Sequence, residues 1–487
     1  MRFRASSGAL VGLILLVGLV LRLFRLDGQS LWFDEAYSIS VSRLPFTEAV
    51  DALVADVRQA PLHFAALAGW MKLAGTGVWG ARLFSVLASA GGLVFAWLFA
   101  RRLFGARTAL LTVTLLAVAQ LDQRYAQEAR MYALYASLTT CAAWLGARAV
   151  LDRDRLSFFA AAVVGALAVL THYYALWALV ALAAWAVSVR RAHPLPATRW
   201  IGGLLLFLAL IVPWWLLGAG RQAERVGAVL PQRPESWFAV DATSALRTLN
   251  ELHGGLVPLL HEPASWAAAL GALLLGVPVL LGLRRSATED EPTGAASPGA
   301  ASTGGVRLCV LLVVLPLVTA LLLGAAFRFQ YATRYLLPCL VPYLTLAARG
   351  LTSISFAAVR AAWIGAAILW GLAGIAVQTE TVHKVQWREA LRQLVDERGE
   401  SEATLFLPGE RVPLEWGIYH PELDARSTAL DAALSEDGPP GLWLVAFERT
   451  PAQAEATLQL RRRLAQGFVE HGETVFFRVR LVHFARR

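Results

Sequence analysis

Two adjacent carboxylates, Asp34 and Glu35, stand in the stretch SLWFDEAYS (residues 30–38), directly after an apolar segment long enough to cross a membrane. A carboxylate can take a proton from an attacking hydroxyl group and so act as a general base. Arginines that hold a phosphate would keep such a carboxylate ionised and would stabilise the charge on a departing phosphate. A carboxylate among arginines at a membrane surface therefore predicts transfer of a group carried on a lipid phosphate.

The polar residues that could do this chemistry gather at one side of the predicted membrane domain. They are Asp34, Glu35, Arg58, His63, Arg82, Asp122, Arg124, Gln127, Glu128, Arg130, His172, Arg328 and Arg334. An ionisable group near the bilayer midplane is costly and usually marks a transport path, and the sequence places almost none there. The pattern favours an enzyme with a site on one face over a transporter.

Composition places the elements that carry these residues in lipid. Of 487 residues, 57% are hydrophobic and 16% are charged, and the mean hydropathy is +0.54. The net charge of +9 comes largely from arginines in short loops between apolar segments, so we expect no nucleic-acid partner. Cys141, Cys309 and Cys339 all lie in apolar segments, which indicates buried thiols and neither a disulfide framework nor a metal site.

About eleven segments are apolar over the length that spans a bilayer, which is about 20 residues. They begin near residues 8, 80, 107, 131, 156, 174, 199, 264, 306, 334 and 355. With the N-terminus inside, the arginine-rich short loops all fall on the cytoplasmic side, as the positive-inside rule requires. The first segment has no small-residue cleavage site after it, so we predict that it is retained in the membrane.

This topology divides the chain into two predicted domains. Residues 1–378 form the transmembrane domain, with a first outer loop at 27–79 and a flexible cytoplasmic linker at 286–305 that is rich in Gly, Ala, Ser and Thr. Residues 379–487 form a small extracytoplasmic α/β domain. Its expected helices are WREALRQLVDERG and PAQAEATLQLRRRLAQG, and its expected strands are TLFLP, GLWLVAF and TVFFRVRLVHF.

Several motifs, in order, resemble bacterial glycosyltransferases of the GT-C fold, the group that contains protein O-mannosyltransferases and lipid A aminoarabinose transferases. They are WFDEAYS, QAPLHFAALAGWMKLAG, QRYAQEARMYALYA, THYYALWALVALA, RYLLPCLVPYLTLAARGL and WREALRQL. The resemblance implies a polytopic α-helical membrane enzyme of the bacterial inner membrane, with its active site facing the periplasm or outside. It also implies a polyprenyl-phosphate sugar donor and a lipid, polysaccharide or protein acceptor.

The resemblance also assigns site residues where the motifs match. Asp34 would be the catalytic base, and Glu35 would position Asp34 or the acceptor. The residues expected to face the donor are Gln127, Glu128, Arg130, Tyr132, Arg334 and Tyr335. The family usually has HPPL or EKPPL where this chain has RQAPLHF, and this departure leaves Arg58 and His63 only as nearby candidates. Arg82, His172 and Tyr173 complete the predicted site.

Each of these residues also has a simpler interpretation. An acidic pair after a membrane segment can be a solvated loop or the start of the next helix. Arg130 and Arg334 can extend their side chains to the interface, or Arg130 can pair with Glu128. His172, Tyr173 and Tyr174 fit an aromatic belt, and Arg82 can serve only to orient a helix.

The sequence requires no cofactor. Asp34, Glu35 and Glu128 offer oxygen ligands suited to Mg²⁺ or Mn²⁺, which some GT-C enzymes use, so a divalent cation stays possible. GTGVWG (residues 75–80) lacks the lysine of a nucleotide-binding loop, which argues against a sugar-nucleotide donor. We therefore expect one inverting displacement, with a lipid-linked sugar flippase or transporter as the alternative function and a structural or sensory membrane protein as a further one.

Overall fold

The computed structural model describes residues 2–56, 59–219, 240, 242–254, 265–285, 298–327, 331–407, 413–420 and 428–487. The chain forms two compact units. The first, the helical unit, comprises Met1–Leu26, Leu44–Gly75 and Gly80–Gln378. The second, the sheet unit, comprises Asp27–Arg43, Thr76–Trp79 and Thr379–Arg487. The acidic stretch 27–43 therefore belongs to the same unit as the C-terminal domain.

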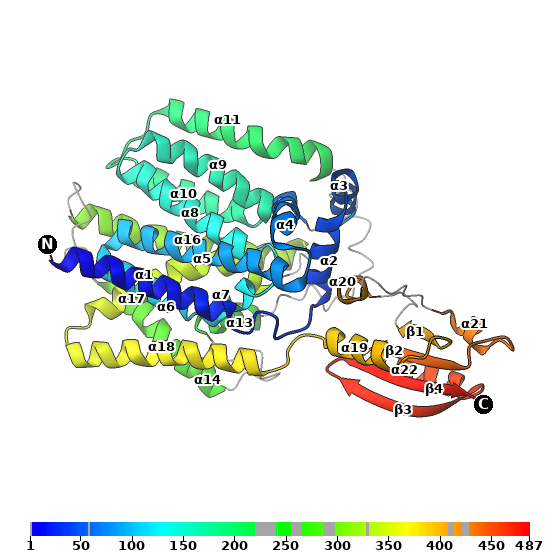
Figure 1. Cartoon of the computed structure of the whole chain (residues 1–487). Helices are drawn as coiled ribbons and strands as arrows, with labels where there is room; N and C mark the ends of the chain where they lie inside the picture. The colour runs from blue at the N-terminus through cyan, green and yellow to red at the C-terminus, as the bar shows by residue number, and fades with distance from the viewer. Residues whose placement is uncertain are drawn as a thin grey trace. The chain divides into compact units, whose positions relative to one another are not determined.

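Long apolar helices make up the helical unit (Figure 1). Their bounds are α1 (Arg2–Leu23), α3 (Phe46–Ala55), α4 (Pro61–Ala74), α5 (Val78–Phe104), α6 (Ala106–Ala117), α7 (Gln120–Ala126), α8 (Tyr132–Leu151), α9 (Arg155–Thr171), α10 (Ala175–Ser188), α11 (Ala197–Trp214), α13 (Ala242–Leu252), α14 (Ser265–Gly271), α15 (Val277–Arg284), α16 (Pro298–Phe327), α17 (Leu340–Ser353) and α18 (Ala357–Glu380). Short irregular turns extend three of these helices: η1 (Trp215–Ala219), η5 (Ala272–Gly276) and η7 (Thr333–Cys339).

Within the described residues, six helical segments are long and apolar enough to cross a membrane. They are Val78–Phe104, Tyr132–Leu151, Ala197–Gly218, Trp266–Arg284, Thr303–Ala326 and Ala357–Glu380. Shorter apolar helices cover Gly8–Leu23, Ala106–Ala117, Arg155–Thr171 and Ala175–Ser188. A multi-pass membrane protein is therefore indicated, whereas the expected count of eleven spans is not confirmed.

Two predicted boundaries differ from the structure. The segment expected to begin near residue 334 starts as the 3₁₀ turn η7, and α17 begins only at Leu340, because Pro338 interrupts regular helical hydrogen bonding. Residues 298–305, expected to be part of the flexible linker, form the first turns of α16. The rest of that linker lies outside the described residues.

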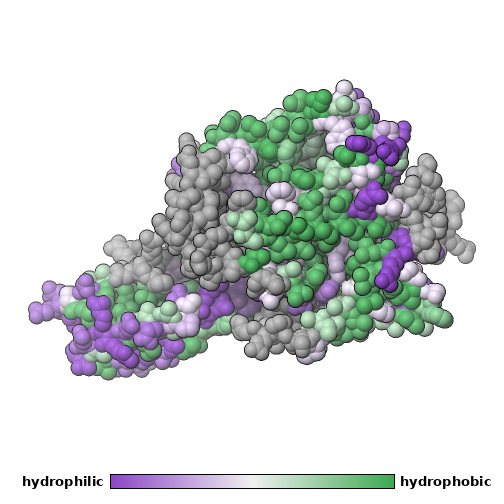
Figure 2. Space-filling model, turned by 180° about the vertical axis from the view of Figure 1, so that it is seen from behind, coloured by the Kyte–Doolittle hydropathy of each residue, from purple (hydrophilic) through white to green (hydrophobic). Residues whose placement is uncertain are grey.

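The outer surface of the helical unit is apolar, as a lipid-facing surface must be. Figure 2 shows hydrophobic residues over most of the helical part and hydrophilic residues over the part that carries the sheet. Exposed leucines on several helices contribute to this surface, among them Leu13 on α1, Leu205 on α11, Leu322 on α16 and Leu369 on α18. In water such an exposed apolar surface would be a liability, so the helical unit requires lipid around it.

Inside the helical unit, close helix packing depends on small residues. At the contact of α15 with α17, a Cβ atom on Gly350 would overlap the carbonyl oxygen of Pro278, and one on Gly282 would overlap that of Leu346. Glycine at both positions lets the two backbones approach closely, which is how membrane helices gain contact where burial from water is unavailable.

The sheet unit is built on a four-stranded sheet with the order β1-β2-β4-β3. Its strands are β1 (Ala403–Leu407), β2 (Gly441–Phe447), β3 (Phe468–Phe476) and β4 (Val479–Arg486), and its helices are α2 (Phe33–Arg43), α19 (Trp387–Glu397), α20 (Trp416–Tyr419), α21 (Leu430–Leu434) and α22 (Pro451–Leu464). Strands β1 and β2 pair in parallel, and the other pairs are antiparallel. One face packs on α19 and the other on α21 and α22, which confirms a small C-terminal sheet domain.

The segment TVFFRVRLVHF was expected to form one strand but contains a hairpin. Phe476 pairs with Val479, so Phe477 and Arg478 form a two-residue turn between β3 and β4. Arg478 takes a positive φ of 63° there. Two-residue hairpin turns usually show Asn or Gly at such positions, and the absence of that signal explains why a single strand was predicted.

Candidate functional site

In the helical unit, two arginines from distant parts of the chain lie over one tyrosine ring. The guanidinium carbon of Arg130 is 5.9 Å from the centre of the Tyr132 ring. That of Arg334 is 5.8 Å from the same ring and 5.5 Å from the ring of Tyr335. Arg130 lies just before α8 and Arg334 lies in η7. Cations are attracted to the faces of aromatic rings at such distances, so Tyr132 brings two like charges to one place.

Further aromatic rings extend this arginine–tyrosine cluster. His172, at the end of α9, stacks on Tyr135 at 4.8 Å and lies 5.1 Å from Tyr335 and 5.9 Å from Tyr132. Tyr174 lies 5.1 Å from Tyr335. The Tyr135 hydroxyl donates a hydrogen bond of 3.0 Å to the carbonyl oxygen of Tyr335. This bond ties η7 to α8 and so fixes the position of Arg334.

The charges of the two arginines affect the pKa values of neighbouring histidines. Burial, together with the charges of Arg130 and Arg334, lowers the pKa of His172 to about 3. Burial also lowers the pKa of His63 to about 3, with Arg130 acting in the same direction. Both imidazoles are therefore neutral at physiological pH. The arginines remain the positive groups of this cluster, and they would attract an anion.

Two acidic residues interact with arginines of this region. Glu251, at the end of α13, interacts with Arg124 and Arg334, and Thr333 donates a hydrogen bond to its carboxylate. Burial raises the pKa of Glu251, and the two arginines act against that rise. Glu128 is 2% exposed and acts electrostatically on Arg124. Arg124, Glu128 and Glu251 thus form a charged group next to the arginine–tyrosine cluster.

The loop that departs from the family pattern contacts the cluster through Gln59. Arg130 donates a long hydrogen bond of 3.5 Å to the Gln59 side-chain oxygen, and the Tyr173 hydroxyl donates one of 3.2 Å to the Gln59 carbonyl. Tyr173 in turn accepts a bond of 2.8 Å from the indole of Trp214. Gln59 is 5% exposed. The neighbouring candidate Arg58 lies outside the described residues.

Two other predicted residues link elements within the helical unit. Arg82 is 1% exposed and donates a hydrogen bond of 3.0 Å to the Leu26 carbonyl. The Gln127 amide donates bonds of 3.0 and 2.8 Å to the carbonyl oxygens of Arg22 and Phe24, at the end of α1. In this arrangement both side chains orient α1 and the chain that follows it.

A buried ion pair supports the same region. Arg22 of α1 pairs with Asp122 of α7 at 2.5 Å, and Ser89 of α5 donates a bond of 2.6 Å to the same carboxylate oxygen. Arg22 is fully buried. The pair therefore fixes α7 and the Gln127–Arg130 stretch against α1.

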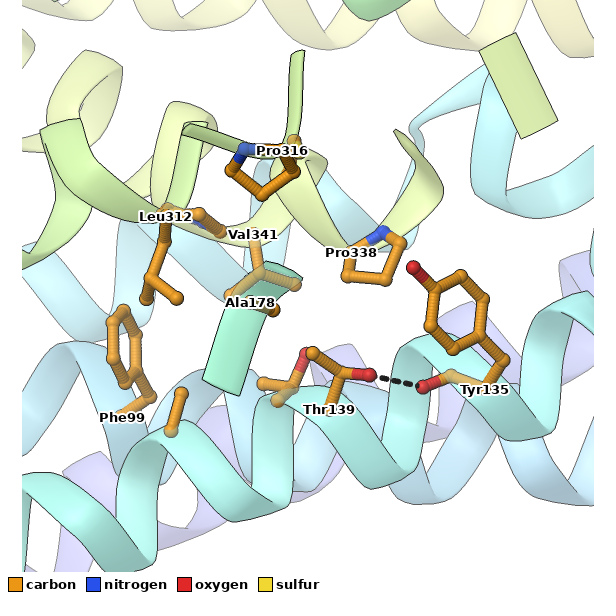
Figure 3. A pocket seen from close by; sticks show the side chains of 12 residues that line it. Phe99, Tyr135, Thr139, Ala178, Leu312, Pro316, Pro338 and Val341 are labelled. Carbon is orange, nitrogen blue, oxygen red and sulfur yellow. Dashed lines mark hydrogen bonds between the residues drawn. The ribbon is translucent and has the colours of Figure 1, made fainter. Parts of the chain in front are cut away.

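An apolar pocket lies next to Tyr135, as Figure 3 shows. Its walls come from α5, α8, α10, α16 and the η7–α17 junction, and they include Phe99, Leu312, Pro316, Pro338 and Val341. The Thr139 hydroxyl points toward the Tyr135 backbone and donates a bond of 2.8 Å to its carbonyl oxygen, so it offers the pocket little free polarity. The pocket suits apolar atoms.

The predicted acidic pair lies in the sheet unit, in the first turn of α2. Asp34 is half-buried, whereas Glu35 is fully buried. Glu35 pairs with Lys384, with an Nζ to Oε2 distance of 2.8 Å. Glu415, 2% exposed, also interacts with Glu35. Asp34 and Glu35 lie at the N-terminus of α2, where the helix dipole favours negative side chains.

The structure provides no test of the predicted divalent cation. Among the described residues, no group of three or more His, Cys, Asp or Glu side chains has the spacing of a metal site. The expectation of Mg²⁺ or Mn²⁺ binding by Asp34, Glu35 and Glu128 stays a prediction.

Sequence reasoning brought several of these residues to one place and missed others. His172, Tyr132 and Tyr335 were predicted and do lie together with Arg130 and Arg334. The residues that sequence reasoning did not assign to the site were Tyr135, Tyr174, Glu251, Lys384 and Glu415, and Arg124 was named only among the polar residues of the same side. Arg124 and Tyr135 flank the matched QEARMYAL stretch, which is a signal that was present. Lys384 and Glu415 belong to no motif.

A family model matches part of the chain. Residues 58–217 match the family model described as dolichyl-phosphate-mannose-protein mannosyltransferase. The matched segment includes Arg130, Tyr132 and His172, and it does not reach Asp34 or Arg334. No curated protein matches the chain.

Solved structures with the same fold cover nearly the whole chain. ArnT from Cupriavidus metallidurans bound to undecaprenyl phosphate is 15% identical, with 97% of each chain covered and a TM-score of 0.63. The oligosaccharyltransferase AglB from Archaeoglobus fulgidus, in complex with an inhibitory peptide and a dolichol-phosphate, is 12% identical over 96% of this chain and 73% of that chain, with a TM-score of 0.50. The same enzyme tethered to an acceptor peptide is 11% identical over 99% and 74%, with a TM-score of 0.53. The chain thus shares the GT-C fold, and the predicted resemblance is confirmed.

Proposed function

We propose that this protein is an integral membrane glycosyltransferase that moves a sugar from a polyprenyl-phosphate donor to an acceptor hydroxyl group, with inversion at the anomeric carbon. The acceptor would be a lipid, a polysaccharide or a protein, and the sugar a hexose or a pentose. The reaction would take place on the extracytoplasmic side of a bacterial inner membrane. The fold, the family match and the arginine–tyrosine cluster support this proposal.

The arrangement of Arg130 and Arg334 over Tyr132 is the observation that carries it. Two guanidinium groups held over one ring repel each other. Glu251 interacts with Arg334 and offsets part of that repulsion, and an anion bound by both arginines would offset more of it. Arginine binds phosphate bidentately and stays charged under all physiological conditions. A phosphate that carries both a sugar and a lipid would therefore be the natural ligand of this cluster.

The lipid part of the donor finds suitable surroundings in the same unit. Several helices of this unit expose apolar side chains, against which a polyprenyl chain would pack. The structures of ArnT and AglB that share this fold were solved with undecaprenyl phosphate and dolichol-phosphate, respectively. These similarities favour a polyprenyl phosphate over a sugar nucleotide as the donor.

In the proposed reaction, the Asp34 carboxylate takes the proton of the acceptor hydroxyl group. The hydroxyl oxygen then forms a bond to the anomeric carbon from the face opposite the phosphate. The bond from the anomeric carbon to the phosphate oxygen breaks, and its electron pair leaves with the polyprenyl phosphate. Arg130 and Arg334 stabilise the negative charge that grows on this leaving group. Protonated Asp34 finally releases its proton to water.

The test is sugar transfer by purified protein. Radiolabelled polyprenyl-phosphate sugars are supplied as donors, and a total membrane extract of the source cell is supplied as acceptor. We expect label to move from the donor to a fraction of the extract, and fractionation then identifies the acceptor. A second arm uses sealed liposomes to ask whether the protein moves the intact lipid-linked sugar across the bilayer. Movement without transfer would reject the enzyme and favour the predicted alternative of a flippase.

A further inference from the structure

We propose that the C-terminal domain positions residues 27–43, called here the acidic loop, through the buried ion pair of Lys384 and Glu35. These two residues would be positioning residues for Asp34. This assigns a task to the domain at 379–487, which carries no predicted catalytic residue. The proposal rests on the proposed function only in naming Asp34 as the base. The structural claim, that Lys384 holds the loop, stands on contacts within the sheet unit.

The acidic loop is attached to the C-terminal domain along its length. Before α2, the Ser30 hydroxyl accepts a bond of 2.7 Å from the Arg388 backbone, and the Leu31 backbone donates one of 2.7 Å to the Tyr419 hydroxyl. At the last residue of α2, Arg43 donates a bond of 3.2 Å to the Gly417 carbonyl. These bonds come from both ends of the stretch, so they hold α2 against the domain.

The ion pair lies between these attachments. Lys384 and Glu35 meet at 2.8 Å, with side chains 8% and 0% exposed. Removing one partner from a buried ion pair is strongly destabilising, because the other charge stays buried without compensation. Removing both charges together is much less harmful for the same reason. The carboxylate of Glu35, next to Asp34, is thus paired with Lys384. Through this pair Glu35 holds the first turn of α2 in place.

Glu415 increases the need for a positive charge near Glu35, which Lys384 supplies. Glu415 is 2% exposed and is a second buried acidic side chain close enough to Glu35 for the charge of Glu35 to act on it. Without Lys384, two acidic residues would remain in a buried environment with less positive charge. We therefore infer that loss of Lys384 would push α2 away from the domain and misplace Asp34.

The chain offers an internal control for this idea. It contains only two lysines, Lys72 and Lys384. Lys72 is exposed on α4 of the helical unit, whereas Lys384 is buried. Amine-reactive labelling of the detergent-solubilised protein, read by mass spectrometry, compares the two directly. We expect Lys72 to react at least tenfold faster in the wild type, and we expect Glu35→Gln to raise the rate at Lys384. Equal labelling rates of Lys72 and Lys384 in the wild type would contradict the proposal that Lys384 is buried in an ion pair.

Hydrogen exchange then tests whether the pair holds the loop. We expect Lys384→Met to increase amide exchange in residues 27–43 at least tenfold, Lys72→Met to leave it unchanged, and the double variant Glu35→Gln/Lys384→Met to restore much of the protection. Unchanged exchange in Lys384→Met would overturn the proposal. Should this variant fail to fold, folding of the double variant would support the proposal, and failure of both variants to fold would reject it.

Activity of the same variants separates positioning from catalysis. We expect Lys384→Met to lower kcat for sugar transfer at least tenfold with little change in the donor KM, and the double variant to regain most of it. No recovery in a double variant whose loop is again protected would make Glu35 a catalytic residue and overturn its positioning role. If the wild type transfers no sugar, the proposed function fails, and the exchange data alone decide the structural claim.

Discussion

The guanidinium carbons of Arg130 and Arg334 lie 5.9 and 5.8 Å from the centre of the Tyr132 ring. They come from positions about 200 residues apart in the chain, so the fold itself must hold them together against their repulsion. A phosphate would relieve that repulsion and would be bound by both. We therefore expect donor binding to depend on both arginines.

Replacing Arg334 by Met should weaken donor use. A hydrogen bond to a charged group contributes about 1.5–3 kcal/mol, so we expect kcat/KM for the polyprenyl-phosphate sugar to fall by roughly tenfold to a hundredfold. Arg334→Lys keeps the charge but loses the planar fork, and we expect an intermediate loss. Steady-state kinetics in detergent with a varied donor concentration measures both variants.

Arg191→Met provides the matched control for this prediction. Arg191 is exposed in the loop between α10 and α11, and its loss should leave the kinetics unchanged. If Arg334→Met kept the full kcat/KM of the wild type, the two arginines would not hold the donor phosphate.

Residue identities in the cluster could be read from the sequence because they belong to contiguous motifs. QEARMYAL supplies Arg130 and Tyr132, and RYLLP supplies Arg334 and Tyr335. Their assembly depends on contacts such as the bond from Tyr135 to the Tyr335 carbonyl, which pattern alone does not reveal. Lys384 could not be found at all, because its partner Glu35 lies about 350 residues away.

At the scale of elements, close approach of α15 and α17 sets the packing of the helical unit. A Cβ on Gly350 would overlap the Pro278 carbonyl oxygen. We therefore expect Gly350→Ala to lower stability by about 1–3 kcal/mol through overpacking, measured as a lower thermal unfolding midpoint in detergent.

Gly365→Ala is the control for packing, because nothing lies within 4 Å of the position where its Cβ would be built. Alanine is favoured over glycine inside a helix such as α18, so this variant should be as stable as the wild type or slightly more stable. Equal midpoints for Gly350→Ala and Gly365→Ala would contradict the close contact of α15 with α17.

The sheet unit should lose stability as the pH rises. Burial, together with the charge of Glu35, which is itself paired with Lys384, raises the pKa of Glu415 to about 7. Because this pKa is raised in the folded state, its contribution to stability is present below about pH 4.5 and is lost as the pH rises through about 7. A shift of this size corresponds to about 3 kcal/mol.

Glu415→Gln removes this titration. Between pH 5 and pH 8, we expect protection factors in residues 413–420 to fall in the wild type and to change much less in the variant, after correction for intrinsic exchange rates. Glu397→Gln, at an exposed position of α19, should behave like the wild type. Parallel pH profiles for wild type and Glu415→Gln would show that Glu415 does not control this stability.

Element types were predictable where periodicity and composition were strong. The amphipathic α19, the long apolar helices and the buried strand β2 all follow from their sequence patterns. The β3–β4 hairpin was missed because Arg478 takes a positive φ without a Gly or Asn signal. The start of α17 was misplaced because Pro338 sits inside an otherwise continuous apolar stretch.

At the scale of the whole molecule, the orientation in the membrane decides which groups meet on one side. Arginine-rich short loops predict that the N-terminus, the linker at 286–305 and the loop with Arg191 are cytoplasmic. We expect a cysteine placed at Ser297 to be labelled only after the cells are opened, and one placed at Glu397 to be labelled from outside. The native Cys141, Cys309 and Cys339 are buried and should add little background. Labelling of the linker position from outside intact cells would show that the predicted topology is inverted, and the proposed extracytoplasmic site would then be wrong.

The division into two units could not be foreseen from the sequence. The first outer loop was predicted as one segment at 27–79, whereas residues 27–43 and 76–79 belong to the sheet unit and residues 44–75 to the helical unit. Hydrophobicity marks the boundary at residue 379 but says nothing about which distant loop joins the soluble domain. That association depends on specific hydrogen bonds and one buried ion pair.

The central claim is that Asp34 removes the acceptor proton in a sugar transfer from polyprenyl phosphate. The most direct measurement is kcat for labelled sugar transfer by purified wild type and Asp34→Asn, with thermal stability matched. General-base catalysis contributes about 10²–10⁴-fold, so we predict a loss of kcat in that range, little change in the donor KM and an unchanged unfolding midpoint. Full turnover by a folded Asp34→Asn would contradict the account.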